Sequence, residues 1–360
     1  MKKLIALLLP LILAFGCFSG CKIKDERTVI NVYNWGQYMS DGSDGYLDVI
    51  AEFERQNPDI RVNYVTFDSN ETMYTKMKNG GITVDVIIPS DYMVGRLAQE
   101  GMLMELNYDN IPNAALVNER FINEDYAPYC VPYAWGTVGI IYNTKYVSEE
   151  DVTGWELLWN ENYAGKILMF DNSRDAFCIA QCKLGYDINT TNEQELLHCA
   201  QELAAQRPVV QQYVMDQVFD LMENEEAWIA PYYAGDYLTM AEENEDLAFY
   251  LPQNQGFNLF VDSMCIPTCS KNKEAAERFI NFLCEPEIAG GNMDWVCYCT
   301  PIDSAKAYMD PEVVEDPNAY PPEEVLNKGM GYTPLPRTTT RLMEELFMQV
   351  RNGIPIHLPD

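Results

Sequence analysis

The sequence predicts an α/β protein with two lobes, and two observations support this prediction. The first is length: about 335 residues follow an N-terminal leader, whereas single hydrophobic cores stop growing at about 250–300 residues. The second is an alternation of strand-like and helix-like segments, which occurs near the N-terminus and again in the middle of the chain. Such alternation is typical of parallel sheets covered by helices on both faces.

The first alternating series ends at Gly101. Residues 29–33 begin it as a strand, and residues 46–56 carry apolar side chains at helical spacing before an Asn-Pro stop. Asn70 is the expected N-cap of a later helix. The further elements expected in this series are a strand at 60–67, a helix at 71–78, a buried strand at 84–88 and a helix at 92–100.

The second series starts after residue 165 and has the same order of elements. A capping box at 191–194 predicts the start of one helix, and the Pro-rich stretch 311–336 is expected to be loop. Together with a return to the first lobe near residue 263, this completes two lobes. The expected elements are strands at 166–170, 227–230 and 263–267, and helices at 174–184, 273–284 and 338–351.

The N-terminus has the features of a lipoprotein signal peptide, predicted over residues 1–20. Two lysines precede an apolar stretch at 4–15, which is shorter than the ~20 residues that a spanning helix needs. Ser-Gly immediately before Cys21 indicates lipidation at Cys21, with Cys17 as the weaker candidate and an uncleaved anchor as the alternative. Residues 21–28 then form a polar tether. The rest of the chain is therefore expected outside the cytoplasm, attached to the membrane through the anchor.

The chain is strongly acidic, with a formal net charge of -31. Removing residues 1–20 takes away two lysines and no acids, so the charge of the remainder becomes -33. A negative field repels polyanions, so nucleic acid is not expected as a partner. Attraction of cationic solutes and simple solubility explain the charge equally well.

Cysteine and histidine usage argues against a metal site. Of eleven cysteines, nine remain after Cys17 and Cys21, without any Cys-x-x-Cys pair, and the chain has two histidines. The spacing of Cys178 and Cys182 fits one face of a buried helix. No metal and no cofactor are expected, while one or two disulfides remain open for an exported protein.

Several loops combine aromatic side chains with carboxylates, and most of these loops follow predicted strands. In open α/β sheets, ligands bind at the carboxyl ends of strands. Aromatic faces and carboxylates together suit an organic cation; ordinary core aromatics beside solvated acids are the alternative. The candidate residues are Trp35, Tyr38, Asp91, Tyr92, Asp171, Asp175, Tyr233, Asp236, Phe260, Asp262 and Tyr298.

Signatures of catalysis are missing from the sequence. It contains no G-x-S-x-G, no P-loop and no G-x-G-x-x-G after a strand. His198 and His357 lie on a predicted helix and in the tail, where neither is placed to act as a base. A secreted hydrolase using Asp175 and Asp262 stays as the alternative from another class, but we expect a protein that is not an enzyme.

Six segments together resemble the spermidine/putrescine-binding proteins of polyamine ABC transporters. The resemblance extends from about residue 29 to residue 353. The segments are 32–38 (VYNWGQY), 69–74 (SNETMY), 85–92 (DVIIPSDY), 131–137 (VPYAWGT), 170–177 (FDNSRDAF) and 271–276 (KNKEAA).

This resemblance implies the type II periplasmic-binding fold, in which two α/β lobes joined by crossing strands close on a ligand. It implies a first lobe at 29–137 and 262–306, and a second at 138–261 and 307–353. By the same resemblance, an aromatic cage would consist of Trp35, Tyr38, Tyr92, Tyr233, Phe260 and Tyr298. The groups that would hold ammonium are Ser90, Asp175, Asp236 and Asp262, with Asp171 as a helper.

The resemblance also implies partners: a polyamine ligand and an ABC permease with its ATPase, served by a monomeric receptor. A receptor for another cationic or zwitterionic solute, or a sensor subunit, remain alternatives. The chain departs from the family pattern at several positions, since Asn172 is an acid in some spermidine binders. Tyr233 and Phe260 are often Trp, and Gly36 replaces a hydroxyl residue. These departures leave the choice between putrescine and spermidine open, with fewer carboxylates favouring the diamine.

Overall fold

The computed structural model describes residues 26–358. The signal peptide, most of the tether and the lipidation candidates Cys21 and Cys17 lie outside the described residues. Within 26–358, no helix has the length and apolarity needed to cross a bilayer.

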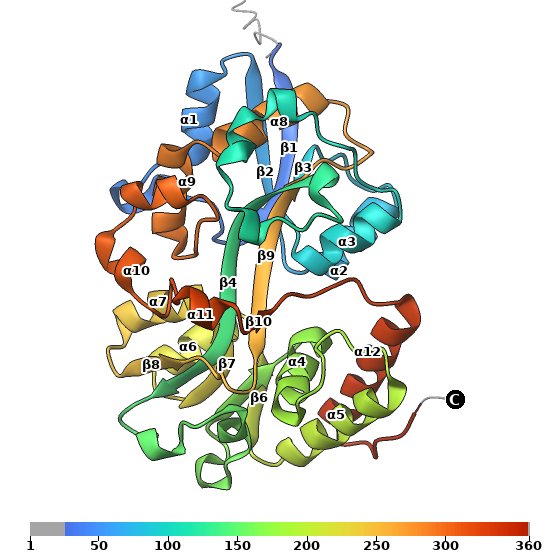
Figure 1. The fold of residues 1–360 in the computed structure, drawn as a ribbon, viewed down its shortest axis with the longest axis vertical. Helices are drawn as coiled ribbons and strands as arrows, with labels where there is room; N and C mark the ends of the chain where they lie inside the picture. Colours follow the sequence, from blue (N-terminus) through green and yellow to red (C-terminus); the bar gives the residue numbers. More distant parts are fainter. Residues whose placement is uncertain (1–25, 359–360) are drawn as a thin grey trace, which may run out of the picture.

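The fold consists of two α/β lobes joined by two long antiparallel strands, β4 (Cys130–Asn143) and β9 (Phe257–Cys265), as Figure 1 shows. The strand order is β2-β1-β3-β9-β4-β7-β5-β6, with β8 paired to β4 and β10 paired to β9. The predicted fold class is therefore confirmed. The other strands are β1 (Thr28–Trp35), β2 (Ile60–Phe67), β3 (Val86–Ile87), β5 (Ile167–Phe170), β6 (Val210–Val214), β7 (Ile229–Tyr233), β8 (Leu247–Tyr250) and β10 (Gly329–Met330).

Strands β1, β2 and β3 pair in parallel in the first lobe, and β5, β6 and β7 do so in the second. Strand β4 pairs with β9 up to Thr137 and with β7 from Val138 onward, so one continuous strand serves both sheets. The bounds given above for the two lobes stay a prediction.

Helices cover both lobes (Figure 1). Those of the first lobe are α1 (Val49–Gln56), α2 (Asn70–Lys78), α3 (Asp91–Gln99), α8 (Lys273–Leu283) and α9 (Pro286–Val296). Those of the second lobe are α4 (Ser173–Leu184), α5 (Glu193–Gln206), α6 (Gln217–Glu223), α7 (Ala234–Glu243) and α12 (Arg337–Asn352). Two short helices, α10 (Pro311–Glu315) and α11 (Glu323–Leu326), lie in the chain between α9 of the first lobe and α12 of the second.

Local signals explain several of these helix starts. The Asp48 side chain accepts a hydrogen bond from Ala51 N–H at the start of α1, and Asn172 accepts one from Asp175 N–H at the start of α4. Asn70 was wrongly expected as a cap, because Ser69 accepts from Thr72 N–H instead. The side chain of Asn70 is thereby free to donate to the Tyr92 hydroxyl.

Two other expectations about local structure were wrong. Asn192, and not the preceding threonine, caps α5 by accepting from Gln194 N–H. The stretch 311–336 holds α10, α11 and β10 rather than loop alone. Pro311, Pro322 and Pro336 lie at the starts of α10, α11 and α12, where a missing N–H costs little.

Candidate functional site

Four of the predicted aromatic residues form a continuous row beside the crossing strands. The ring centroids of Tyr38 and Tyr298 are 5.2 Å apart, those of Tyr298 and Phe260 6.0 Å, and those of Phe260 and Tyr233 5.5 Å. Tyr38 follows β1, Tyr298 follows α9, Phe260 lies on β9 and Tyr233 ends β7. Segments from both lobes therefore meet in this row.

Asp262 lies at one end of the row and is 5% exposed. The Tyr38 hydroxyl donates to its Oδ2 over 2.7 Å, whereas its buried Oδ1 has no hydrogen-bond partner among the described residues. Burial raises the pKa of Asp262 to about 6, and the hydroxyls of Tyr38 and Ser90 oppose that rise. Ser90 is thus placed beside Asp262, and the two also form a backbone bridge.

Asp236 lies in the first turn of α7. Burial raises its pKa to about 7, and the repulsion of Asp216 adds to the rise, while the hydroxyl of Tyr298 lowers it. Among residues 26–358, no lysine or arginine acts on the pKa of Asp236 or of Asp262. A buried carboxylate, Asp262, and a half-buried one, Asp236, are therefore stabilised by neutral hydroxyls alone.

Asp91, the first residue of α3, is a further half-buried acid. Burial raises its pKa to about 8, and the repulsion of Asp262 contributes to the rise. Three groups oppose it: the N–H of Tyr92, at 2.6 Å from Oδ1, the N–H of Tyr332 and the positive charge of Arg174. Asp91 therefore differs from Asp236 and Asp262 in having a cation nearby.

Asp175 has a complete set of hydrogen-bond donors. The hydroxyl of Tyr233 donates to Oδ2 over 2.8 Å, the hydroxyl of Tyr332 to Oδ1 over 2.9 Å, and the amide of Asn172 to Oδ2 over 2.6 Å. This carboxylate is 8% exposed. Asp175 lies beside Tyr233 of the row. Because neutral donors already stabilise its charge, a cation would stabilise Asp175 less than Asp236 or Asp262.

Asp171 is engaged elsewhere, because it forms an ion pair with Arg351 of α12. The Arg351 guanidinium also lies 5.7 Å from the ring centre of Tyr213. The structure therefore places Asp171 beside a basic partner after β5, and among residues 26–358 no hydrogen bond or ion pair joins it to the aromatic row.

Trp35 and Tyr92 make their ring contacts outside the row. The ring of Trp35 packs against Phe67 with centroids 4.6 Å apart, and its buried Nε1 has no partner among the described residues. The hydroxyl of Tyr92 donates to Glu71 over 2.9 Å, and its ring packs edge-on to Tyr332 at 6.2 Å. No direct contact joins Trp35 to Asp236 or Asp262 in the part of the chain that the structure describes.

Sequence reasoning missed two tyrosines near the site. Tyr332 is 6% exposed, and its hydroxyl donates to Asp175. It lies in a segment that is neither helix nor strand, so no periodic sequence pattern pointed to it. Tyr133 donates from β4 to the carbonyl of Tyr38 over 2.5 Å and accepts from Asn292, which fixes the loop after β1. Tyr133 lies in the segment 131–137, whose resemblance to the family could have identified it.

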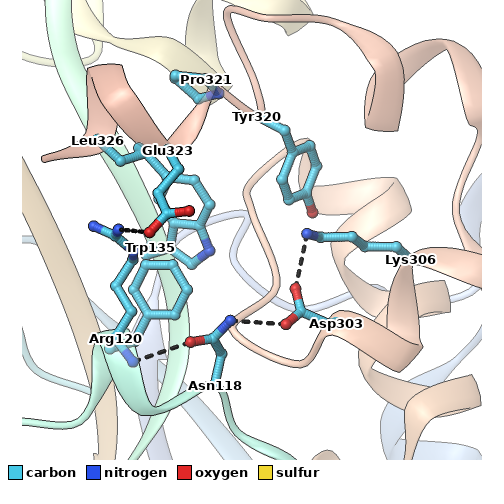
Figure 2. A pocket seen from close by; sticks show the side chains of 10 residues that line it. Asn118, Arg120, Trp135, Asp303, Lys306, Tyr320, Pro321, Glu323 and Leu326 are labelled. Atoms are coloured by element: carbon cyan, nitrogen blue, oxygen red, sulfur yellow. Dashed lines mark hydrogen bonds and ion pairs between the residues drawn. The ribbon is translucent and has the colours of Figure 1, made fainter.

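A surface pocket of about 660 Å³ lies on the other face of the crossing strands (Figure 2). A Cβ at Gly136 would meet the Phe260 ring at 2.7 Å, and successive side chains of a strand point to opposite faces, so Trp135 faces away from the aromatic row. The acids here have basic partners: Asp303 pairs with Lys306 at 2.9 Å and Glu323 with Arg120 at 3.3 Å. This pocket therefore lacks the uncompensated charge found at Asp236 and Asp262.

Metal binding finds no support in the described residues, where no group of three or more His, Cys, Asp or Glu side chains could hold an ion. The nine cysteines within 26–358 are free thiols. Cys178 and Cys182 lie on one face of α4 with their Sγ atoms 4.0 Å apart.

Two lobes joined by crossing strands, with aromatic and acidic side chains where they meet, are the architecture of a solute-binding protein. Comparison with known proteins agrees: the chain belongs to the bacterial extracellular solute-binding proteins, whose family model matches residues 48–321. The family description agrees with the expected location outside the cytoplasm.

Curated relatives cover nearly the whole chain. The spermidine/putrescine-binding periplasmic protein of Escherichia coli K12 is 29% identical over 333 residues, which is 91% of this chain and 93% of that protein. The spermidine/putrescine-binding periplasmic protein 1 of Haemophilus influenzae is 30% identical, with 91% and 93% covered. These relatives are substrate-binding proteins and not enzymes. The chain is therefore a binding protein, and the alternative of a secreted hydrolase was wrong.

Solved structures show the same fold. A putative spermidine/putrescine ABC transporter protein from Listeria monocytogenes superposes with a TM-score of 0.83 at 34% identity, over 90% of this chain and 99% of that one. The substrate-binding protein PotD of a spermidine/putrescine ABC transporter from Streptococcus pneumoniae gives 0.79 at 33% identity, with 90% and 99% covered. The type II periplasmic-binding fold expected from the resemblance is confirmed.

Proposed function

We propose that the chain captures a polyamine, putrescine or spermidine, outside the cytoplasm and delivers it to an ABC importer. One observation carries the proposal: the buried Asp262 and the half-buried Asp236 lie beside Tyr38, Tyr298 and Phe260, and no described lysine or arginine offsets their charges. The names of the relatives point to the same ligands.

The chemistry of the site suits a flexible dication. Each buried carboxylate costs free energy unless a charge or hydrogen bonds compensate it, and an ammonium group supplies both. The row of rings would cover the methylene groups and attract the charged ends through their faces. Closure of the lobes would exclude water and strengthen these contacts. In this proposal Trp35, Tyr92, Asp91 and Ser90 complete the walls, and Asp175 orients the tyrosines.

The proposal includes the route of the ligand. A lipid on Cys21 would keep the monomeric receptor near a membrane permease, whose cytoplasmic ATPase would drive import. A sensor subunit would bind the same ligand, and co-purification with the permease, measured with and without polyamine, separates the two roles.

A thermal-shift panel tests the proposed ligand class. The chain lacking residues 1–21 is heated with putrescine, spermidine, spermine, cadaverine, amino acids or sugars. Since a ligand that binds the native state raises the melting temperature by mass action, we expect a rise with the amines and none with sugars. A rise with an amino acid alone would indicate a receptor for a zwitterionic solute and contradict the polyamine proposal.

A further inference from the structure

A short segment between β10 and α12 contacts both lobes. We call residues 331–336 the strap. It leaves β10, which pairs in parallel with β9 through Gly329 and Met330, and it runs between α3 and α4 toward the start of α12 (Figure 1). The strap is thus a third connection at the place where the lobes meet, in addition to β4 and β9.

The second lobe holds the strap through several polar contacts. Asn189 donates to the carbonyl of Gly331 over 3.0 Å and accepts from Thr333 N–H over 2.9 Å. The hydroxyl of Tyr332 donates to Asp175, and the Arg174 guanidinium lies 4.4 Å from the centre of the Tyr332 ring. These contacts anchor the strap on α4 and on the loop that follows it.

The first lobe contacts the other side of the strap through α3. A Cβ at Gly331 would lie 3.8 Å from Oδ2 of Asp91, and the ring of Tyr332 meets Tyr92 edge-on. Pro334 lies against Gly95 so closely that a Cβ at position 95 would lie 2.3 Å from Pro334 Cγ and 2.6 Å from the Tyr126 ring. The strap is therefore packed between the two lobes.

This contact explains a glycine inside a helix. Gly95 is the fifth of nine residues in α3 and is buried, where glycine costs about 1 kcal/mol relative to alanine. The close approach of Pro334 and Tyr126 leaves no room for a methyl group. A glycine with low helix propensity is therefore present at the point where the strap contacts α3.

We propose that the strap is a positioning element of the binding site, which holds α3 against α4 when the lobes are closed on a ligand. Tyr332 carries this role by contacting both lobes, and Pro334 by packing against Gly95 of the first lobe. The proposal deepens the proposed function, because it makes the residence time of a bound polyamine depend on residues that lie outside the Asp236 and Asp262 region.

The first test compares two helical glycines in the full chain. Gly95→Ala places a methyl group where Pro334 lies, whereas Gly291→Ala, in α9, meets Leu47 at an ordinary 3.5 Å. Dissociation of putrescine, followed by stopped-flow tryptophan fluorescence, should be at least fivefold faster in Gly95→Ala and equal to that of the unsubstituted chain in Gly291→Ala. Equal rates in all three proteins would overturn the proposal.

A second variant separates the strap from Tyr126, which also lies near Gly95. Pro334→Ala removes the ring on the strap and leaves α3 intact, so dissociation should again be faster. If Pro334→Ala keeps the unsubstituted rate while Gly95→Ala does not, the effect comes from Tyr126 within the first lobe and the strap has no positioning role.

Hydrogen exchange gives a readout that does not require knowledge of the ligand. Peptides covering residues 329–336 should exchange at least tenfold faster in Gly95→Ala than in Gly291→Ala. A strap that exchanges equally fast in both variants would overturn the inference. Failure of the unsubstituted chain to bind either putrescine or spermidine would instead contradict the proposed function, and the exchange comparison would still decide the role of the strap.

Discussion

The aspartates near the aromatic row differ in how their carboxylates are stabilised. Asp262 and Asp236 have raised pKa values and receive help from hydroxyl groups alone, whereas Asp175 accepts from two tyrosines and an asparagine. Asp171, which precedes Asp175 in the chain, forms an ion pair with Arg351. Acids in one region are therefore not equivalent, and uncompensated charge is concentrated at Asp236 and Asp262.

The largest expected effect comes from removing one of these charges. Asp262→Asn should weaken putrescine binding at least tenfold by calorimetry, because the ligand's ammonium would lose its charged partner while still being desolvated. Asp303→Asn is the matched control, since Asp303 already pairs with Lys306 in the surface pocket, and its dissociation constant should stay within twofold. Equal effects of the two changes would remove the distinction between the regions.

The affinity should also depend on pH. The pKa values of Asp262, Asp236 and Asp91 are raised to about 6, 7 and 8, so lowering the pH from 8 to 6 progressively protonates them. Binding of a dication to the charged forms must then release protons, and the affinity should fall several-fold over this interval. Calorimetry in buffers of different ionisation enthalpy measures the released protons, and a constant affinity with no release would contradict the raised values.

A smaller effect is expected at Asp171. Asp171→Asn breaks a partly exposed ion pair with Arg351, and such pairs contribute about 0–1 kcal/mol. The putrescine dissociation constant should change by less than threefold and the melting temperature should fall slightly. If instead the loss of affinity approaches that of Asp262→Asn, Asp171 contacts the ligand after all.

The smallest effect concerns stability without ligand. Because the folded-state pKa values of Asp262, Asp236 and Asp91 exceed the ordinary 3.8, the folded protein binds more protons than the unfolded chain. Their contribution to the free energy of unfolding is therefore full below about pH 4 and is lost as the pH rises to about 8. Melting curves of Asp262→Asn should show a shallower decline over this range than those of the unsubstituted chain, and parallel curves would contradict this.

The sequence predicted the alternating elements well, because β1, α1 and β2 each have the apolar spacing of their type. It missed the two crossing strands as strands of full length. Strand β4 is buried almost throughout, so it lacks alternation, and its Pro132, Gly136 and Gly139 are unfavourable for strands taken alone. Gly136 is needed because Phe260 fills the space of its side chain.

Local sequence patterns point to only part of the candidate site. Tyr38, Tyr233, Phe260, Asp262 and Tyr298 were identifiable, since aromatic residues beside acids at strand ends are a local signal. The pairing of Asp175 with Tyr332, which are 157 positions apart, and of Asp171 with Arg351 depends on tertiary packing, and no local pattern predicts it.

Calorimetric titration at pH 8 with putrescine and with 1,4-butanediol, its neutral analogue of equal chain length, tests most directly whether uncompensated carboxylates select the ligand. We predict saturable one-to-one binding of putrescine, with release of protons, and no measurable binding of the diol. Equal binding of both compounds, or binding of neither putrescine nor spermidine, would contradict the central role given to Asp236 and Asp262.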